Sequence, residues 1–272
     1  MYIIMGKLEA ILNGESIRFD SEVTEVREFI YRNHPNIDYA SLFENQRVVF
    51  FGEQHTLVSP KDDFLAGIAE MASAGVTHIG YEFLPVSMQS EIDRFYEKGD
   101  NREQLLKHFN EGKIYDEQCA ERYMQIVETA KANGIKVVAL DFEADTVQRQ
   151  EISHTFNGRN QQWAKLMSDI LNSDPNSKIA VYCGGAHAGY YPVDDRANNE
   201  LRKQGHDSLT VKYCGGQIFK KDYVFGFDDK VAKSAVEAGL QRQRFVVNVD
   251  RTMSRESDLY IHLPQVEKPK LI

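Results

Sequence analysis

Apolar residues fall into two kinds of run along the chain, and the difference between them predicts the order of helices and strands. Short continuous β-branched and aromatic runs are typical of strands buried on both faces, and apolar positions three to four residues apart are typical of amphipathic helices. The short runs predict strands at 47–52, 76–83, 136–142 and 178–183 and, later, at 209–213, 245–249 and 259–263. Apolar residues at helical spacing lie between the first four predicted strands, so strands and helices alternate along the chain.

This alternation indicates crossover units and an α/β fold with a mixed, largely parallel central sheet flanked by helices on both faces. The last strands are expected to pair in antiparallel fashion at one edge. No stretch reads as a linker, so we expect a single domain over residues 1–272. Within it, 1–45 would pack on the body as an N-terminal extension, 46–192 would carry the motifs, and 193–272 would supply edge strands and helices.

Residues capable of chemistry follow the predicted strands. The first strand runs into Gly-Glu-Gln-His, ending at His55, and the fourth into Gly-Gly-Ala-His, ending at His187. With 18 glycines and 8 histidines in 272 residues, about 0.5 Gly-x-x-His matches are expected by chance. The second strand ends at Glu82, and the third delivers Asp141 and Glu143. Because parallel strands meet at their carboxyl ends, these side chains are expected at one sheet edge.

Histidine with carboxylate offers the nitrogen and oxygen ligands that suit Mn, Fe, Co or Zn. A metal held by two histidines and one carboxylate would keep positions for water and substrate, which is hydrolytic chemistry; iron held that way would also suit redox reactions. Structural explanations remain open for each residue alone. His55 would then be a strand-end histidine bonded to a loop carbonyl and His187 a packed histidine. Glu53 and Glu82 would be helix-capping acids, and Asp141 and Glu143 solvated loop acids.

Composition narrows the class of partner. The formal net charge of -9 argues against nucleic-acid binding, and no apolar run is long enough to span a membrane. The polar N-terminus does not resemble a signal peptide, and the three cysteines lack metal-site spacing, so we expect reduced thiols in the cytoplasm. No nucleophile-elbow, phosphate-loop or dinucleotide motif is present. The expected partner is a small-molecule or peptide substrate, with the oligomeric state left open.

Four motifs between Arg47 and Tyr190 together resemble the Tiki/TraB/ChaN/erythromycin-esterase superfamily. They are Val-Val-Phe-Phe-Gly-Glu-Gln-His, Gly-Tyr-Glu-Phe, Arg-Asn-Gln-Gln-Trp and Gly-Gly-Ala-His, in that order. The resemblance implies an erythromycin-esterase/ChaN-like fold with a site made of paired Gly-x-x-His motifs, a strand-end glutamate and an arginine.

Carried over to this chain, the resemblance implies a role for each matching residue. His55, Glu82 and His187 would hold the divalent metal, Glu53 would act as general base, and Arg159 would steady an anionic intermediate. Asp141 and Glu143 would support the site.

The implied activity is metal-dependent hydrolysis of an amide or ester bond, as in Tiki-type metalloproteases. Two alternatives follow from other branches of the superfamily. One is a haem-binding, ChaN-like protein, for which the sequence assigns no axial ligand. The other is an erythromycin-esterase-like hydrolase in which a histidine activates water without a metal. The sequence shows neither the lipoprotein signal of ChaN nor the membrane anchor of Tiki, so those roles do not transfer directly.

Overall fold

Seven strands form one sheet in the computed structural model, which describes residues 38–55, 57–111, 117–142, 156–189, 196–215, 231, 234–236, 238–248 and 257–264. The strands lie in the order β3-β2-β4-β1-β5-β7-β6. Their bounds are β1 Val48–Glu53, β2 His78–Pro85, β3 Lys136–Asp141, β4 Ile179–Gly184, β5 Leu209–Gly215, β6 Phe245–Asn248 and β7 Leu259–Leu263. The expected extension up to residue 37 lies outside the described residues, as does Glu143.

Every neighbouring pair of strands is parallel except β6 and β7, which pair in antiparallel fashion at the edge. The seven strands predicted from the sequence are therefore confirmed, within two residues at each end, and so is the mixed, largely parallel sheet. β1 and β4 lie at the centre, where neither face meets solvent, and both strands are buried throughout. Continuous apolar runs are what such strands require.

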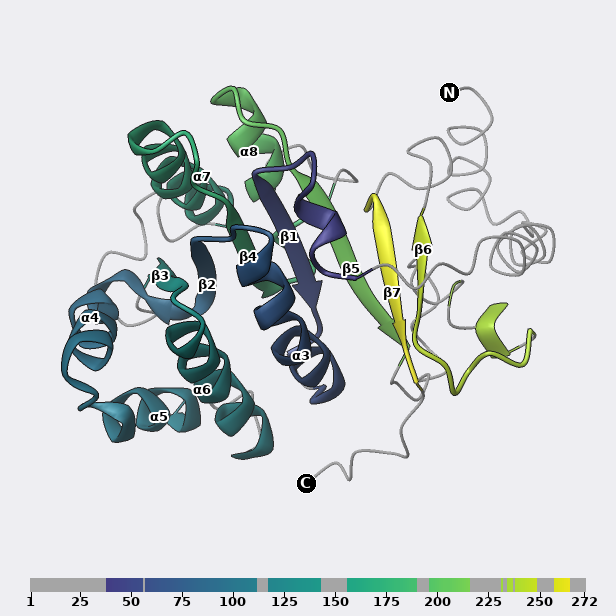
Figure 1. Ribbon diagram of the computed structural model, residues 1–272, viewed down its shortest axis with the longest axis horizontal. Coiled ribbons are helices and arrows are strands. Elements are labelled where there is room, and N and C mark those ends of the chain that lie inside the picture. The colour runs from purple at the N-terminus through teal and green to yellow at the C-terminus, as the bar shows by residue number, and fades with distance from the viewer. Residues whose placement is uncertain are drawn as a thin grey trace.

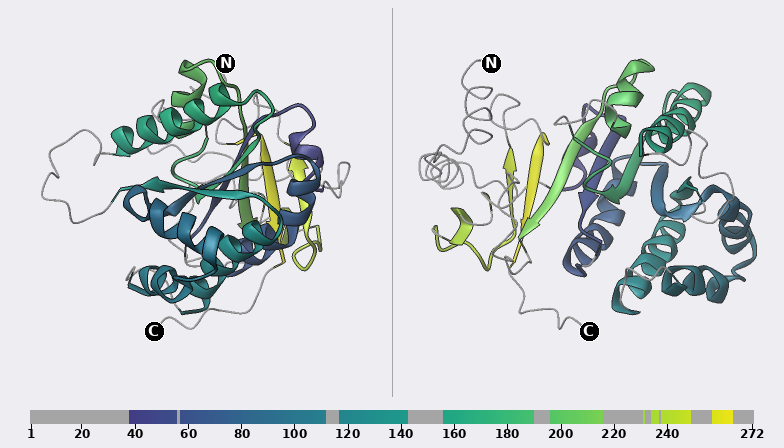
Figure 2. Two further views of the ribbon diagram at one scale, coloured as in Figure 1. Left: turned by 60° about the vertical axis from the view of Figure 1, so that its left-hand side comes forward. Right: turned by 180° about the vertical axis from the view of Figure 1, so that it is seen from behind.

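Helices cover both faces of the sheet, as expected, and Figures 1 and 2 show the two layers. Between β1 and β3 the chain moves toward one edge, and its crossovers place α3–α6 on one face. It then turns back through β4 to β5, and a crossover of the same hand places α7 and α8 on the other. The bounds are α3 Ser59–Ser73, α4 Gln89–Lys98, α5 Arg102–Glu111, α6 Glu117–Ala132, α7 Phe156–Ser173 and α8 Ala197–Lys203, with 3-10 turns η1 Ser41–Phe43 and η2 Val86–Met88.

Alternate residues of each strand supply the two cores. Phe51, Tyr81 and Tyr182 point to the α3–α6 side, whereas Phe50 and Val181 point to the α7–α8 side. All five are fully buried. Burying a large apolar side chain contributes about 1.5–3 kcal/mol, so these positions favour one register of the sheet.

The start of α3 differs from the sequence expectation. The pattern Ser-Pro-x-Asp predicts Ser59 as the N-cap, yet the N-cap is Val58, whose backbone is already helical, and Ser59 is the first helical residue. The turn before it is closed instead by the amide N–H of Leu57, which donates to the carbonyl of Gln54 at 3.0 Å. Lys61, in the first turn of this helix, reaches Glu53 at the end of β1.

A side chain bonds the outer edge of β3, the strand at one end of the sheet. Val137 and Ala139 of β3 lie in the regular part of the ladder with β2, opposite Ile79 and Tyr81. Gln89, the first residue of α4, donates from Nε2 to the carbonyl of Val137 at 3.1 Å and accepts from the amide of Ala139 at 2.8 Å. Its amide group thus supplies the donor and acceptor that a strand neighbour would provide.

None of the helices in the described ranges is both long enough and apolar enough to cross a membrane.

Candidate active site

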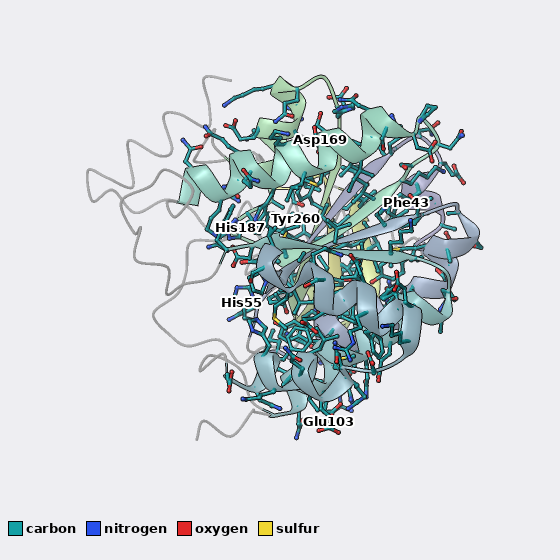
Figure 3. The ribbon with its side chains drawn as sticks, turned by 90° about the vertical axis from the view of Figure 1, so that its left-hand side faces the viewer. Phe43, His55, Glu103, Asp169, His187 and Tyr260 are labelled. Atoms are coloured by element: carbon teal, nitrogen blue, oxygen red, sulfur yellow. The ribbon has the colours of Figure 1, made fainter. Side chains whose placement is uncertain are left out.

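Four adjacent strands, β3, β2, β4 and β1, end at one edge of the sheet and carry the polar residues singled out in the sequence. Glu53 ends β1 in register with Gly184 of β4, Glu82 lies near the end of β2, and Asp141 ends β3. His55 and His187 follow β1 and β4, and Figure 3 shows them near each other, at the edge of the molecule opposite Phe43. Parallel topology therefore gathers the predicted residues, as expected; only Glu143 lies outside the described chain.

Glycines at the strand ends let two backbone segments approach closely. A Cβ atom on Gly52 would lie 2.9 Å from the Cα atom of Gly185. One on Gly184 would lie 2.5 Å from Cε1 and 2.8 Å from Nε2 of His55. The positive φ angles recorded in the described residues include none of these three glycines. What these positions require is therefore the absence of a side chain.

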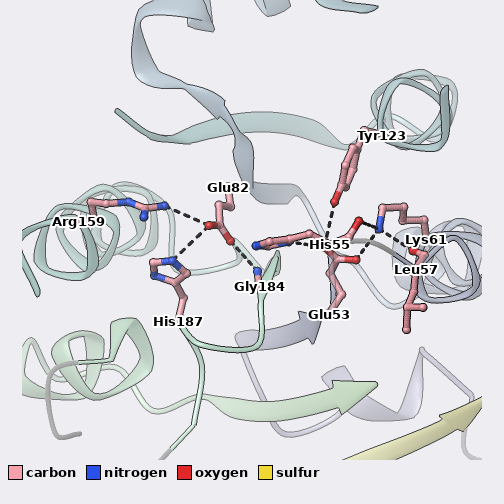
Figure 4. Close-up of polar contacts among 9 residues, drawn as sticks. All are labelled: Glu53, His55, Leu57, Lys61, Glu82, Tyr123, Arg159, Gly184 and His187. Atoms are coloured by element: carbon pink, nitrogen blue, oxygen red, sulfur yellow. Dashed lines mark hydrogen bonds and ion pairs between the residues drawn. The ribbon is translucent and has the colours of Figure 1, made fainter. Parts of the chain in front are cut away.

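The side chain of Glu53 lies at the centre of a buried polar cluster with His55, Lys61 and Tyr123. Its Oε1 atom lies 2.7 Å from Nδ1 of His55 and accepts a hydrogen bond from the Tyr123 hydroxyl at 3.0 Å. Its Oε2 atom accepts from the ammonium of Lys61 at 2.6 Å, and both of these side chains are fully buried. Figure 4 shows these groups converging on the carboxylate. Glu53 is thus enclosed, whereas 31% of the His55 side chain is exposed.

The surroundings of His55 raise its pKa above the ordinary 6.5. Burial works in the opposite direction, and the positive charge of Lys61 does too. The hydrogen bond to Glu53 and the negative charges of Glu82 and Glu53 outweigh them because each stabilises the imidazolium form. This histidine is therefore a stronger base than a free one.

Glu82 is the second buried carboxylate of the site. Its Oε1 atom lies 3.1 Å from Nη2 of Arg159 and 3.2 Å from Nε2 of His187, and its Oε2 atom accepts from the amide of Gly184 at 2.6 Å. Burial alone would raise the pKa of Glu82. The hydrogen bond and charge of His187, the charge of His55 and the Gly184 amide lower it to about 2. Glu82 is ionised at neutral pH and is a weak proton acceptor.

Arg159 joins the ends of β2 and β3. Its Nε and Nη2 atoms donate to the two carboxylate oxygens of Asp141 at 2.7 and 3.0 Å, in addition to the contact with Glu82. Burial raises the pKa of Asp141, and the charge of Arg159 counteracts it. Asp141 is thus close enough to the site to support it by orienting the guanidinium.

His187 is held by α7. Its Nδ1 atom lies 2.7 Å from Oδ1 of Asn160, and its ring lies 4.3 Å from that of Trp163, centroid to centroid, at an angle of 30°. The ring is almost completely buried, in contrast to that of His55. His187 therefore belongs to the packed part of the site, and His55 faces solvent.

The residues expected to bind a metal do not form a metal site in this arrangement. Among the described residues, no group of three or more His, Cys, Asp or Glu side chains is placed to hold an ion. Arg159 bonds Oε1 of Glu82, the Gly184 amide bonds Oε2, and Lys61 neutralises Glu53. A divalent cation would have to displace these partners, so the donor set does not fit a metal.

Three residues of the site were not found by sequence reasoning: Lys61, Tyr123 and Asn160. Each lies on a helix that crosses the sheet near the strand ends, and each bonds an assigned residue. In the sequence Lys61 and Asn160 are ordinary polar helix positions, and Tyr123 belongs to an apolar helix face. The nearest signal is Asn160 itself, which directly follows Arg159 in the motif Arg-Asn-Gln-Gln-Trp.

Comparison with solved structures confirms the fold class. The type III effector HopBA1 superimposes with a TM-score of 0.55 at 15% identity, covering 86% of this chain and 97% of the effector. A Bacillus cereus protein gives 0.54 at 8% identity, covering 89% and 97%. A mutant of erythromycin esterase EreC in its open conformation gives 0.52 at 9%, covering 86% and 94%. At these identities the likeness concerns the fold alone.

No curated protein matches the sequence. Residues 40–176, half of the chain, match the family described as haem-binding uptake, Tiki superfamily, ChaN. This stretch begins before β1 and ends after α7, so it includes Glu53, His55, Glu82 and Arg159. Because this match spans half of the chain, the chain belongs to the haem-binding uptake, Tiki superfamily, ChaN family.

Proposed function

We propose that the protein hydrolyses an ester or amide bond of a small-molecule or peptide substrate, with His55 as the general base. The observation that carries this proposal is the 2.7 Å contact between Nδ1 of His55 and the buried carboxylate of Glu53. A carboxylate that fixes one ring nitrogen leaves the other to accept a proton, as catalytic histidines require. Erythromycin esterase EreC, a hydrolase by name, shares the fold and supports the reaction class.

In this reaction His55 Nε2 removes a proton from water, and the resulting hydroxide attacks the carbonyl carbon. The imidazolium is stabilised by Glu53 and returns the proton to the leaving group. The family resemblance implied the base role for Glu53, but its side chain is fully buried and both oxygens are bonded. Glu53 therefore orients His55 in this proposal.

Glu82 holds two cationic or hydrogen-bonding groups, Arg159 and His187, at the edge that His55 faces. With a pKa of about 2, Glu82 is a poor base, and its role here is to fix these groups in place. Arg159, whose side chain is 24% exposed, supplies positive charge for the oxyanion that forms when hydroxide adds to the carbonyl.

A panel of ester and amide probes tests this function. p-Nitrophenyl acetate and butyrate report esterase activity, and peptide p-nitroanilides report amidase activity. We expect chelator-dialysed protein to hydrolyse at least one probe and His55→Gln to lose about 100-fold in kcat or more. Activity that requires added Mn²⁺, Co²⁺ or Zn²⁺ would instead favour the metal-dependent mechanism. Absence of activity in every arm would remove the proposal.

Haem binding is a second candidate, favoured by the description of the family to which the chain belongs. His55 is the candidate axial ligand, because its ring is the more exposed of the two site histidines and Glu53 fixes its Nδ1 side. Titration with haemin tests this candidate. A Soret band that is lost in His55→Ala would support it, and a featureless titration would remove it.

A further inference from the structure

Lys61 is a fully buried lysine at the beginning of α3, beneath the loop that carries His55. Its ammonium donates to Oε2 of Glu53 at 2.6 Å, to the carbonyl of Leu57 at 2.7 Å and to the carbonyl of His55 at 3.0 Å. The Tyr123 ring lies below it, 4.6 Å from Nζ to the ring centroid. An ammonium has three donors and no acceptor, so each of its hydrogen-bond partners must present an oxygen.

This demand divides the two oxygens of Glu53 between different partners. Oε2 is committed to Lys61, which leaves Oε1 for the hydroxyl of Tyr123 and for Nδ1 of His55. An ionised carboxylate only accepts hydrogen bonds, so Nδ1 of His55 must carry the proton. In the neutral ring the lone pair is then on Nε2, the atom that takes a proton from water.

We propose that Lys61 is a positioning residue of the hydrolytic site, which holds one oxygen of Glu53 and thereby presents the other, as an acceptor, to the Nδ1 proton of His55. The proposal rests on the hydrolase function proposed above. It assigns to Lys61 an effect on catalysis that is transmitted entirely through Glu53, since the ammonium is fully buried and meets no substrate.

The variant Glu53→Gln tests the role of Lys61. In Glu53→Gln, the ammonium still requires an oxygen, so the amide turns its carbonyl to Lys61 and its NH₂ group to His55. Nδ1 must then accept, and the ring proton moves to Nε2, the wrong atom for a base. In the double variant Glu53→Gln/Lys61→Met this demand is removed, and the amide oxygen is able to turn to His55 and restore the proton to Nδ1. The hydroxyl of Tyr123 both donates and accepts, so it adapts to either orientation.

Two readouts test the prediction. The ¹⁵N NMR shifts of the His55 ring report the tautomer directly, and hydrolysis of the best ester or amide probe reports kcat. We expect wild type to carry the proton on Nδ1 and Glu53→Gln to carry it on Nε2 with kcat reduced about 100-fold. The double variant is expected to return to Nδ1 and to exceed Glu53→Gln about 10-fold in kcat. A purely structural lysine predicts the reverse, a double variant less active than the single one.

Lys178→Met is the matched control. Lys178 also donates to two backbone carbonyls, those of Phe43 at 3.0 Å and Ala74 at 2.8 Å, but at the opposite end of the sheet. We expect it to lower the melting temperature and leave the His55 tautomer and kcat unchanged.

The NMR readout separates the two proposals because it requires no activity. If the tautomers follow the prediction but no variant hydrolyses any probe, the positioning role stands and the hydrolase function fails. If Glu53→Gln keeps the proton on Nδ1, or wild type carries it on Nε2, the positioning role is overturned. The wild-type spectrum alone decides whether the ring proton is on Nε2, so this outcome can overturn the role even if Glu53→Gln does not fold.

Discussion

Gly184 lies against the imidazole of His55, so closely that a methyl group on its Cα atom would be 2.5 Å from Cε1 of the ring. The same methyl group would be 3.4 Å from Oε2 of Glu82. The end of β4 thus packs directly against the ring of His55 and the carboxylate of Glu82. The first glycine of the Gly-Gly-Ala-His motif makes room for the histidine of the Gly-Glu-Gln-His motif.

Substitution of Gly184 should therefore impair the site without destroying the fold. In Gly184→Ala the new methyl group must displace the ring of His55, and displacement by about 1 Å from the productive geometry costs about 100-fold in rate. Gly185→Ala is the control, because its Cβ atom would have no neighbour closer than 3.7 Å. Comparison of kcat and melting temperature checks this prediction. Equal activity of the two alanine variants would contradict it.

Gln89 should be required for stability but not for catalysis. Gln89→Ala removes the bond to the carbonyl of Val137 and that from the amide of Ala139 at the outer edge of β3. Loss of these buried partners should lower the free energy of unfolding by about 1–3 kcal/mol, with kcat near that of wild type. Urea denaturation measures the change. An unaltered denaturation midpoint would mean that solvent or a neighbouring group replaces the amide.

Glu82 should make stability depend on pH below the neutral range. A drop of its pKa from the ordinary 4.5 to about 2 corresponds to about 3 kcal/mol of folding free energy. This contribution is present above pH 4.5 and is lost as the pH falls toward 2, since the unfolded state takes up the proton first. The stability difference between wild type and Glu82→Gln should shrink over this range. Glu97→Gln, on the exposed face of α4, is the control and should show no such trend.

The pH dependence of catalysis should report His55. Its pKa is raised, chiefly by the Glu53 hydrogen bond acting against burial, and the neutral ring is the active form. The rate kcat/KM should therefore rise with pH through an apparent pKa above 6.5 and level off once the ring is neutral. Residual activity in Glu53→Gln should show this rise at lower pH, because the carboxylate that stabilises the imidazolium is gone. A pH-independent rate between 6 and 9 would exclude His55 as the base.

The sequence predicted most of the fold because its central strands are buried on both faces. Runs such as 47–52 and 178–183 are continuous in apolar residues for that reason, and parallel pairing of strands then placed Glu53, Glu82 and His187 at one edge. The antiparallel pairing of β6 with β7 also matches expectation. These features follow from local patterns together with the rules for crossover connections.

The details of the site depend on contacts that a local pattern does not encode. Lys61 and Asn160 look like solvated helix positions, yet both are fully buried because a distant strand end supplies a partner, Glu53 for the lysine and His187 for the asparagine. The same contacts change the interpretation of Glu82. A strand-end carboxylate suggests a metal ligand, but Arg159 and the Gly184 amide already bond the two oxygens of Glu82.

The most direct test of the account is hydrolysis by metal-free protein, with His55→Gln compared with His206→Gln. His206 lies beyond α8, bonded to Ser168 at 3.2 Å, and controls for the loss of a histidine elsewhere in the chain. We predict that chelator-dialysed wild type and His206→Gln hydrolyse the same probe at equal rates, and that His55→Gln is slower by about 100-fold or more while keeping its circular dichroism spectrum. Equal rates for His55→Gln and wild type would contradict the account.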